Sequence, residues 1–203
     1  CLFEENVPAR QALYHDYVRP GGCKRCVLEK APFEALNPAK HFAWGTVIGR
    51  FGGKELARNP FQGTELSPEK VGYFKQLVDH KWVARPWLNY GTLLRPLTLT
   101  DISPPGPAEF DPATWIPAGV WRAPDGTVAF VLANARRSTA VTFKCRIDPG
   151  SYGIATDGSV HLQRLTPTGQ PPEPHFEKVA PVTGEFELSQ ELEPGGVLIL
   201  VAR

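Results

Sequence analysis

The chain has 203 residues, with 22 Lys and Arg against 21 Asp and Glu, and a formal net charge of +1. Such a balance disfavours a nucleic-acid or polyanion binder, and no apolar run approaches the roughly 18 to 20 residues that cross a bilayer. The 19 Gly and 21 Pro far exceed the usual share, which argues against an all-helical fold and favours turn-rich β structure.

The first half alternates short apolar runs with helices. The runs at 12–14 and 45–51 predict buried strands, and helices are predicted from Asn37-Pro38 to about Trp44 and over 67–85. The second helix carries an apolar stripe made of Val71, Phe74, Leu77, Val78 and Trp82, and both Trp44 and Trp82 are expected to pack in the core. Strand–helix alternation is typical of right-handed βα units in a parallel sheet. Strands of a parallel sheet need helices on both faces and neighbouring strands on both sides, which two βα units alone cannot supply. We therefore expect residues 1–100 to be the end of a larger α/β domain whose earlier part lies upstream.

A Pro- and Gly-rich connector at 101–107 precedes a half without helices. Strands are predicted over 120–123 and 127–134, joined as a hairpin by an Asp-Gly turn, and over 139–147, 158–165, 183–188 and 197–202. Cys145 falls on the apolar face of its strand, where a buried structural thiol is expected. Closely spaced turns predict an antiparallel β-sandwich over 101–203. The fold class is therefore α/β plus all-β.

Two segments resemble bacterial glycoside-hydrolase-like (β/α)₈ proteins of undefined activity. Residues 3–8 leading to Tyr14-His15-Asp16-Tyr17 resemble a late barrel strand, and 87–96 resemble the exit from the last barrel helix. Trp121, Asp125-Gly126 and a strand ending in Asn134 resemble the sandwich that closes amylases and α-galactosidases. The resemblance implies the last two βα units of a (β/α)₈ barrel followed by that sandwich. Strand seven would lie within 1–17, its helix at 38–45, strand eight at 45–52 and the last helix at 67–85.

In such barrels the active site lies at the carboxyl ends of the strands. Glycosidases need two carboxyl groups across the scissile bond, so Asp16 is the first candidate and Glu4 or Glu5 are further ones. Tyr14, His15 and Tyr17 at the end of the first strand, and Arg50 at the end of the second, are candidates for binding the sugar. The same side chains can also anchor loops. A chain that lacks most of the barrel is expected to be inactive alone.

Two other interpretations stay open. A non-catalytic carbohydrate-binding or structural sandwich would expose Trp115 and Trp121 as a sugar platform, although packing is the commoner role of such residues. A redox or metal protein would use Cys23 and Cys26, but His15 and His41 match no zinc spacing, so a loop thiol pair is favoured. We expect no cofactor and no metal. The sequence leaves the sugar, oligomeric state and cellular location open.

Overall fold

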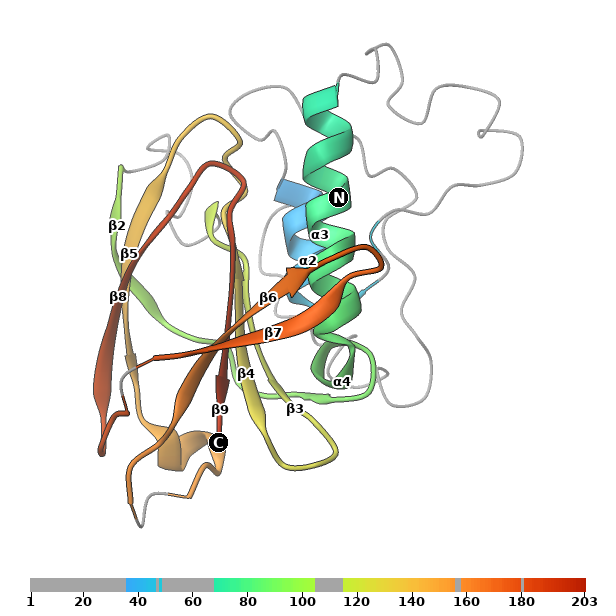
Figure 1. Ribbon diagram of the computed structural model, residues 1–203. Helices are drawn as coiled ribbons and strands as arrows, with labels where there is room; N and C mark the ends of the chain where they lie inside the picture. The colour runs from blue at the N-terminus through green and yellow to red at the C-terminus, as the bar shows by residue number, and fades with distance from the viewer. Residues whose placement is uncertain (1–35, 47, 49–67, 105–114, 156–157, 180) are drawn as a thin grey trace.

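A computed structural model describes residues 36–46, 48, 68–104, 115–155, 158–179 and 181–203. The helices are α2 (Leu36–Ala43), α3 (Pro68–Val83), α4 (Arg85–Leu88) and the 3₁₀ helix η3 (Pro149–Tyr152). The strands are β1 (Thr92–Leu93), β2 (Leu99–Ser103), β3 (Ala118–Arg122), β4 (Val128–Ala133), β5 (Val141–Ile147), β6 (Leu162–Thr168), β7 (Glu173–Lys178), β8 (Phe186–Leu192) and β9 (Val197–Ala202). They form three layers: a small sheet, a large sheet and the helices (Figure 1).

The strands form two antiparallel sheets. The large sheet has the order β1-β3-β4-β9-β6-β7, and the small sheet has the order β2-β5-β8. The predicted antiparallel sandwich is therefore confirmed. The edge strands β1, β2 and β7 were not predicted, and β2 extends into the predicted connector at 101–107. β7 was missed because its sequence, Glu-Pro-His-Phe-Glu-Lys, shows no alternation of apolar residues. Pro174 is tolerated there, since an edge strand leaves one row of backbone groups unpaired.

The predicted hairpin is confirmed as β3 and β4, which pair from Ala118 opposite Leu132 to Arg122 opposite Val128. Its turn is stabilised by Asp125, whose Oδ1 accepts hydrogen bonds from the backbone N of Thr127 at 3.0 Å and from its Oγ1 at 2.6 Å. Gly126 has a φ of +88°, which a residue with a side chain rarely adopts. The Asp-Gly pair thus makes the turn that its sequence predicted.

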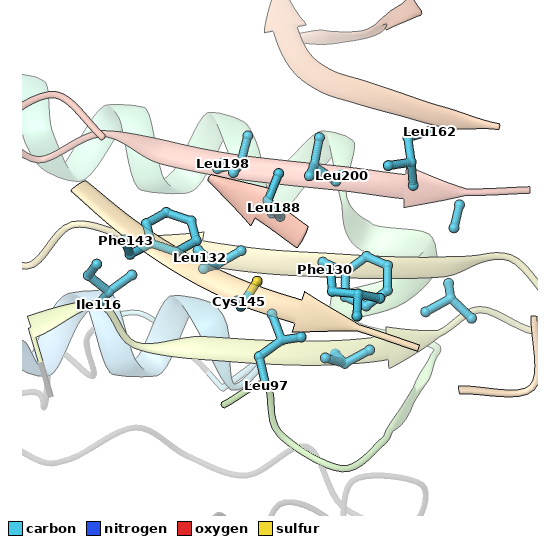
Figure 2. Close-up of a cluster of buried hydrophobic side chains, with 14 of the residues drawn as sticks. Leu97, Ile116, Phe130, Leu132, Phe143, Cys145, Leu162, Leu188, Leu198 and Leu200 are labelled. Atoms are coloured by element: carbon cyan, nitrogen blue, oxygen red, sulfur yellow. The ribbon is translucent and has the colours of Figure 1, made fainter. Parts of the chain in front are cut away.

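The two sheets enclose the first of two cores. β5 alternates regularly, so that Phe143, Cys145 and Ile147 point inward and the residues between them outward. Figure 2 shows Phe143 and Cys145 among side chains of the facing strands β4 and β9, including Phe130 and Leu200. Burial raises the pKa of the Cys145 thiol to about 11, which makes it a packing group and a poor nucleophile. The predicted buried thiol is confirmed.

The second core lies between the large sheet and the helices. Every residue of β4 is buried, because Phe130 and Leu132 face the small sheet while Ala129, Val131 and Ala133 face the helices. The helices contribute apolar side chains to this core, among them Phe42, Leu77, Trp87 and Leu88. The large sheet is therefore covered on both faces, and the helices belong to the same packed unit.

The helices lie where they were predicted, but α3 is oriented differently. Its buried side chains include Tyr73 and Leu77, whereas Val71, Val78 and Trp82 of the predicted stripe are 49%, 52% and 53% exposed. The prediction was wrong about which face packs on the fold, because α3 carries apolar residues on two faces and the spacing alone cannot rank them.

The predicted barrel strand at 45–51 is described only in part. Gly45 lies in a turn with a φ of +65°, and neither Thr46 nor Ile48 is in a strand. All strand pairs in the described part of the chain are antiparallel, so the barrel portion and the division at residue 100 remain predictions. None of the described helices is long and apolar enough to cross a membrane.

Candidate functional site

The residues predicted to carry chemistry lie outside the described residues. This holds for the carboxylates Asp16, Glu4 and Glu5, for the sugar-binding candidates Tyr14, His15, Tyr17 and Arg50, and for Cys23 and Cys26. Their roles remain predictions. Within the described ranges, no group of three or more His, Cys, Asp or Glu side chains has the geometry to hold a metal ion.

The described part of the chain does contain a buried polar cluster between α2 and α3, which we call the Thr46 cluster. It consists of Thr46, His41, Lys40 and Lys81. Thr46 is fully buried, and its Oγ1 lies 2.7 Å from Nδ1 of His41 and donates to the His41 carbonyl oxygen at 3.2 Å. The Nζ of Lys81 donates to the backbone carbonyl oxygen of Thr46. The cluster thus joins the end of α2 to the last turn of α3.

The electrostatics of the Thr46 cluster keep the imidazole neutral. Desolvation by burial, with the positive charges of Lys81 and Lys40 adding to it, lowers the pKa of His41 to about 4. A neutral ring that donates from Nδ1 to the Thr46 hydroxyl fits the hydrogen bonds, since that hydroxyl already donates to a carbonyl. Thr46 cannot reach a substrate while it is fully buried. The cluster therefore fixes the chain where it leaves α2, and it is not a catalytic pair.

Acid should destabilise the fold through His41. Because its folded pKa of about 4 lies below the unfolded value of 6.5, the stabilisation is complete above pH 6.5 and is lost as the pH falls toward 4. From this one residue, we expect the free energy of unfolding to fall by up to about 1 kcal/mol for each pH unit. We expect His41→Gln to flatten the fall of the melting temperature between pH 6.5 and 4.5. His175→Gln, on exposed β7, is the control; equal pH dependence of all three chains would contradict the assignment.

Trp121 connects α2 to the large sheet. The indole Nε1 of Trp121 on β3 donates to the carbonyl oxygen of Ala43 at 2.9 Å, at the end of α2. A side chain on Gly45 would clash with the Trp121 ring, with its Cβ 2.9 Å from a ring carbon. Trp115 and Trp121 are 1% and 0% exposed, which confirms packing and excludes the exposed sugar platform.

The other tryptophans lie nearer the surface than predicted. Trp82, expected in the core, is 53% exposed, and the Arg85 guanidinium lies 4.7 Å from its ring centroid. Trp44 is half-buried, with the Lys40 ammonium 5.6 Å from its ring centroid. A stacked cation explains how these rings remain partly in water, since the charge interacts with the ring face.

The polar groups of Asn134 tie the two sheets together at the end of β4. Its side-chain nitrogen donates to the carbonyl oxygens of Thr139, Leu192 and Glu193 at 2.9 to 3.1 Å. Its side-chain oxygen accepts from the backbone N of Arg136 at 2.9 Å. Sequence reasoning noted this residue only as the end of a strand. An amide side chain directly after a continuous apolar run was the sequence signal that could have indicated this role, because a polar group at the end of a buried strand needs hydrogen-bond partners.

No family model and no curated protein matches the chain. Among solved structures, it is similar to α-galactosidase I from Mortierella vinacea at 8% identity and a TM-score of 0.37, over 86% of this chain and 36% of that protein. It is also similar to the GH51 arabinofuranosidase from Xanthomonas axonopodis pv. citri at 17% identity and a TM-score of 0.33, over 64% of this chain and 25% of that protein. The chain thus spans about a third or less of either protein, and likenesses at these TM-scores establish no shared fold.

Proposed function

We propose that the chain is the C-terminal part of a carbohydrate-active glycoside hydrolase that cleaves O-glycosidic bonds with paired carboxylates. The features that suggested this family in the second half are supported by the described fold. Trp121 lies on a strand that enters the Asp125-Gly126 turn, and the next strand ends at Asn134, inside an antiparallel sandwich. The substrate class remains part of the proposal, because it rests on that resemblance.

The hydrogen bond from Lys81 to Thr46 is the observation that carries the proposal. It places Thr46 beside the last turn of α3, while the chain re-enters that helix at Pro68. The 13 residues from Pro68 to Lys81 rise by about 20 Å, so the chain after Thr46 has to return that far along α3. A strand followed by an antiparallel helix makes this return in every βα unit. The contact therefore agrees with a second βα unit that ends in α3, although Gly45, Thr46 and Ile48 are not themselves in a strand.

On this proposal, the Thr46 cluster lies at the start of the last barrel strand and the chemistry at the other end. Barrel enzymes place catalytic groups at the carboxyl ends of the strands and stabilising contacts at the opposite face. Arg50 would then lie at the catalytic face with Asp16, where Glu4 or Glu5 would supply the second carboxylate. Tyr14, His15 and Tyr17 would contact sugar rings and hydroxyls. The buried Thr46 cluster, with its neutral imidazole, agrees with a structural role at the non-catalytic face.

Hydrolysis of aryl glycosides tests the proposal. We expect no turnover by the 203-residue chain, and turnover of at least one α- or β-linked nitrophenyl sugar by the longer polypeptide read in frame from upstream of Cys1. Asp16→Asn in that polypeptide should lower kcat by at least about 10²-fold, the scale of general acid–base catalysis. Asp101→Asn, at a position of β2 whose side chain is 67% exposed, is the matched control. Robust hydrolysis by the short chain, or full activity of Asp16→Asn, would contradict the proposal.

A further inference from the structure

The outward side of α3 carries an apolar surface made of Val71, Val78 and Trp82, which we call the outer stripe. These residues are 49%, 52% and 53% exposed, and their spacings of seven and four residues place them on one side of the helix. Tyr73 and Leu77, which pack in the core between the helices and the large sheet, lie on the opposite side. One helix thus has one apolar face in a core and a second in contact with water, and an exposed apolar surface of this kind marks an interaction site.

The outer stripe has the spacing of a coiled-coil seam. With Lys75 included, its members follow one another at intervals of four, three and four residues, which is the a and d pattern of a heptad. Lys75 then occupies an a position between apolar neighbours, and its side chain is 53% exposed. A single lysine at such a position costs stability but specifies the register of two paired helices. The outer stripe therefore fits a second helix, and Lys75 determines how that helix runs.

The charges on this side of α3 are complementary to those of a second α3 that runs antiparallel. Lys75 pairs with Asp79 one turn later, with 2.5 Å between Nζ and Oδ2. When two copies pack about a two-fold axis midway between Val71 and Trp82, Val71 of one copy lies opposite Trp82 of the other. Lys75 of each copy then lies opposite Val78 and beside Asp79 of the other, so opposite charges meet twice. In a parallel pair, each charge would instead face its own copy, and like charges disfavour that arrangement.

We propose that α3 is a dimerisation helix, which binds the α3 of a second copy of this chain antiparallel through the outer stripe. The inference uses only α3 and α4, so it does not depend on the proposed function. Trp82 is the main contact, since buried tryptophans supply much of the affinity of protein interfaces. The Arg85 guanidinium, 4.7 Å from the centroid of the Trp82 ring, restrains that ring before binding, so less freedom is lost when it packs on the second copy.

Sedimentation equilibrium of the 203-residue chain in a reducing buffer tests for the dimer. A contact between two helices is smaller than the standard interface of about 1,600 Å², so we expect a weak, reversible dimer within the range of about 5 to 500 µM. Trp82→Ala should raise the dissociation constant at least about tenfold, because it removes the main contact from both ends of the interface. Tyr90→Ala removes another exposed aromatic side chain, 68% exposed and outside the outer stripe, and should leave the constant within about twofold.

Charge exchange tests the pairing across the two-fold axis. Lys75→Glu and Asp79→Lys each place like charges beside each other in the antiparallel pair, so each variant alone should be monomeric over the same range. Mixed in equal amounts, the two variants should associate, because the new glutamate of one chain then meets the new lysine of the other. The double variant Lys75→Glu with Asp79→Lys exchanges both charges and should dimerise like the native chain. Circular dichroism at low concentration checks that each variant is folded.

Single cysteines test the orientation, with Cys1, Cys23 and Cys26 replaced by serine and the buried Cys145 kept. In the antiparallel pair, the two copies of residue 78 differ by about 4.5 Å along the helices and the two copies of residue 71 by about 16 Å. Under oxidising conditions, Val78→Cys should therefore form a disulfide between chains at least about tenfold faster than Val71→Cys. A parallel pair would link both positions at equal rates.

Several results would overturn the proposal. These are a native chain that is monomeric at every concentration, a dimer that Trp82→Ala leaves unchanged, charge variants that do not associate when mixed, and equal linking of Val71→Cys and Val78→Cys. A further measurement asks whether the chain itself covers the outer stripe. Val78→Cys in the monomer should react with a soluble maleimide as fast as Tyr90→Cys, and a rate as slow as that of the buried Cys145 would reject the second copy as the occupant.

Discussion

Replacing Asn134 by aspartate should cost at least about 3 kcal/mol of the free energy of unfolding, more than replacing it by alanine. The amide nitrogen of Asn134 donates to three carbonyl oxygens, contributed by Thr139, Leu192 and Glu193. In Asn134→Asp, an oxygen would replace this nitrogen and face the three acceptors from a fully buried position. Alanine removes the donors without adding a buried charge, so it should cost less.

Thermal and urea unfolding followed by circular dichroism measure this effect. Gln170→Glu makes the same amide-to-acid change at an exposed position and is the control. We expect the order of stability to be native chain and Gln170→Glu together, then Asn134→Ala, then Asn134→Asp. The bracing role of Asn134 is contradicted if Asn134→Asp melts within about 2 °C of the native chain, which corresponds to less than about 1 kcal/mol.

Gly119→Ala should separate α2 from the large sheet, with a loss of about 3 kcal/mol or more. The added Cβ would lie 2.3 Å from the carbonyl oxygen of Ala43 and 2.8 Å from Nε1 of Trp121. These are the two atoms of the hydrogen bond that joins α2 to β3. The first neighbour is backbone and the second belongs to the fully buried Trp121 ring, so neither is the free end of a flexible side chain that could move away.

The matched control for Gly119→Ala is Gly72→Ala, in the interior of α3. A Cβ there meets nothing within 4 Å, so alanine should stabilise the chain by about 0.5 to 1 kcal/mol through its better helix propensity. Opposite shifts of the two melting temperatures are therefore expected from the same chemical change. A melting temperature of Gly119→Ala equal to that of the native chain would show that the contact between α2 and β3 accommodates the added methyl group, and it would contradict this prediction.

The sandwich was predictable where local chemistry decides the structure. The Asp125-Gly126 turn and the strict alternation of β5 each leave one conformation that buries the apolar side chains, and both were predicted correctly. β7 could not be predicted, because its residues make a strand only by pairing with β6. Pairing between distant segments is not encoded in either segment alone.

The helical half was predictable only in outline. The start of α3 and its length followed from the capping residues and the spacing, but its two apolar faces made the choice of the packed face ambiguous. Val78 and Trp82 were assigned to the core for that reason, and both are more than half exposed. The Thr46 cluster was also missed. Lys81 lies 35 residues after Thr46 and contacts its backbone carbonyl oxygen, and a backbone group carries no sequence signal.

The complete burial of β4 has a consequence for how the protein can be divided. Among the described residues, Ala129, Val131 and Ala133 pack against α2, α3 and α4, which precede the sandwich in sequence, and the neighbouring strand β9 adds Ile199 and Val201 to the same surface. A shortened polypeptide beginning at residue 101 would expose this apolar face of the large sheet to water, and it would also lack β1. It should self-associate or stick to other proteins, so apparent sugar binding by such a piece would say little about the intact molecule.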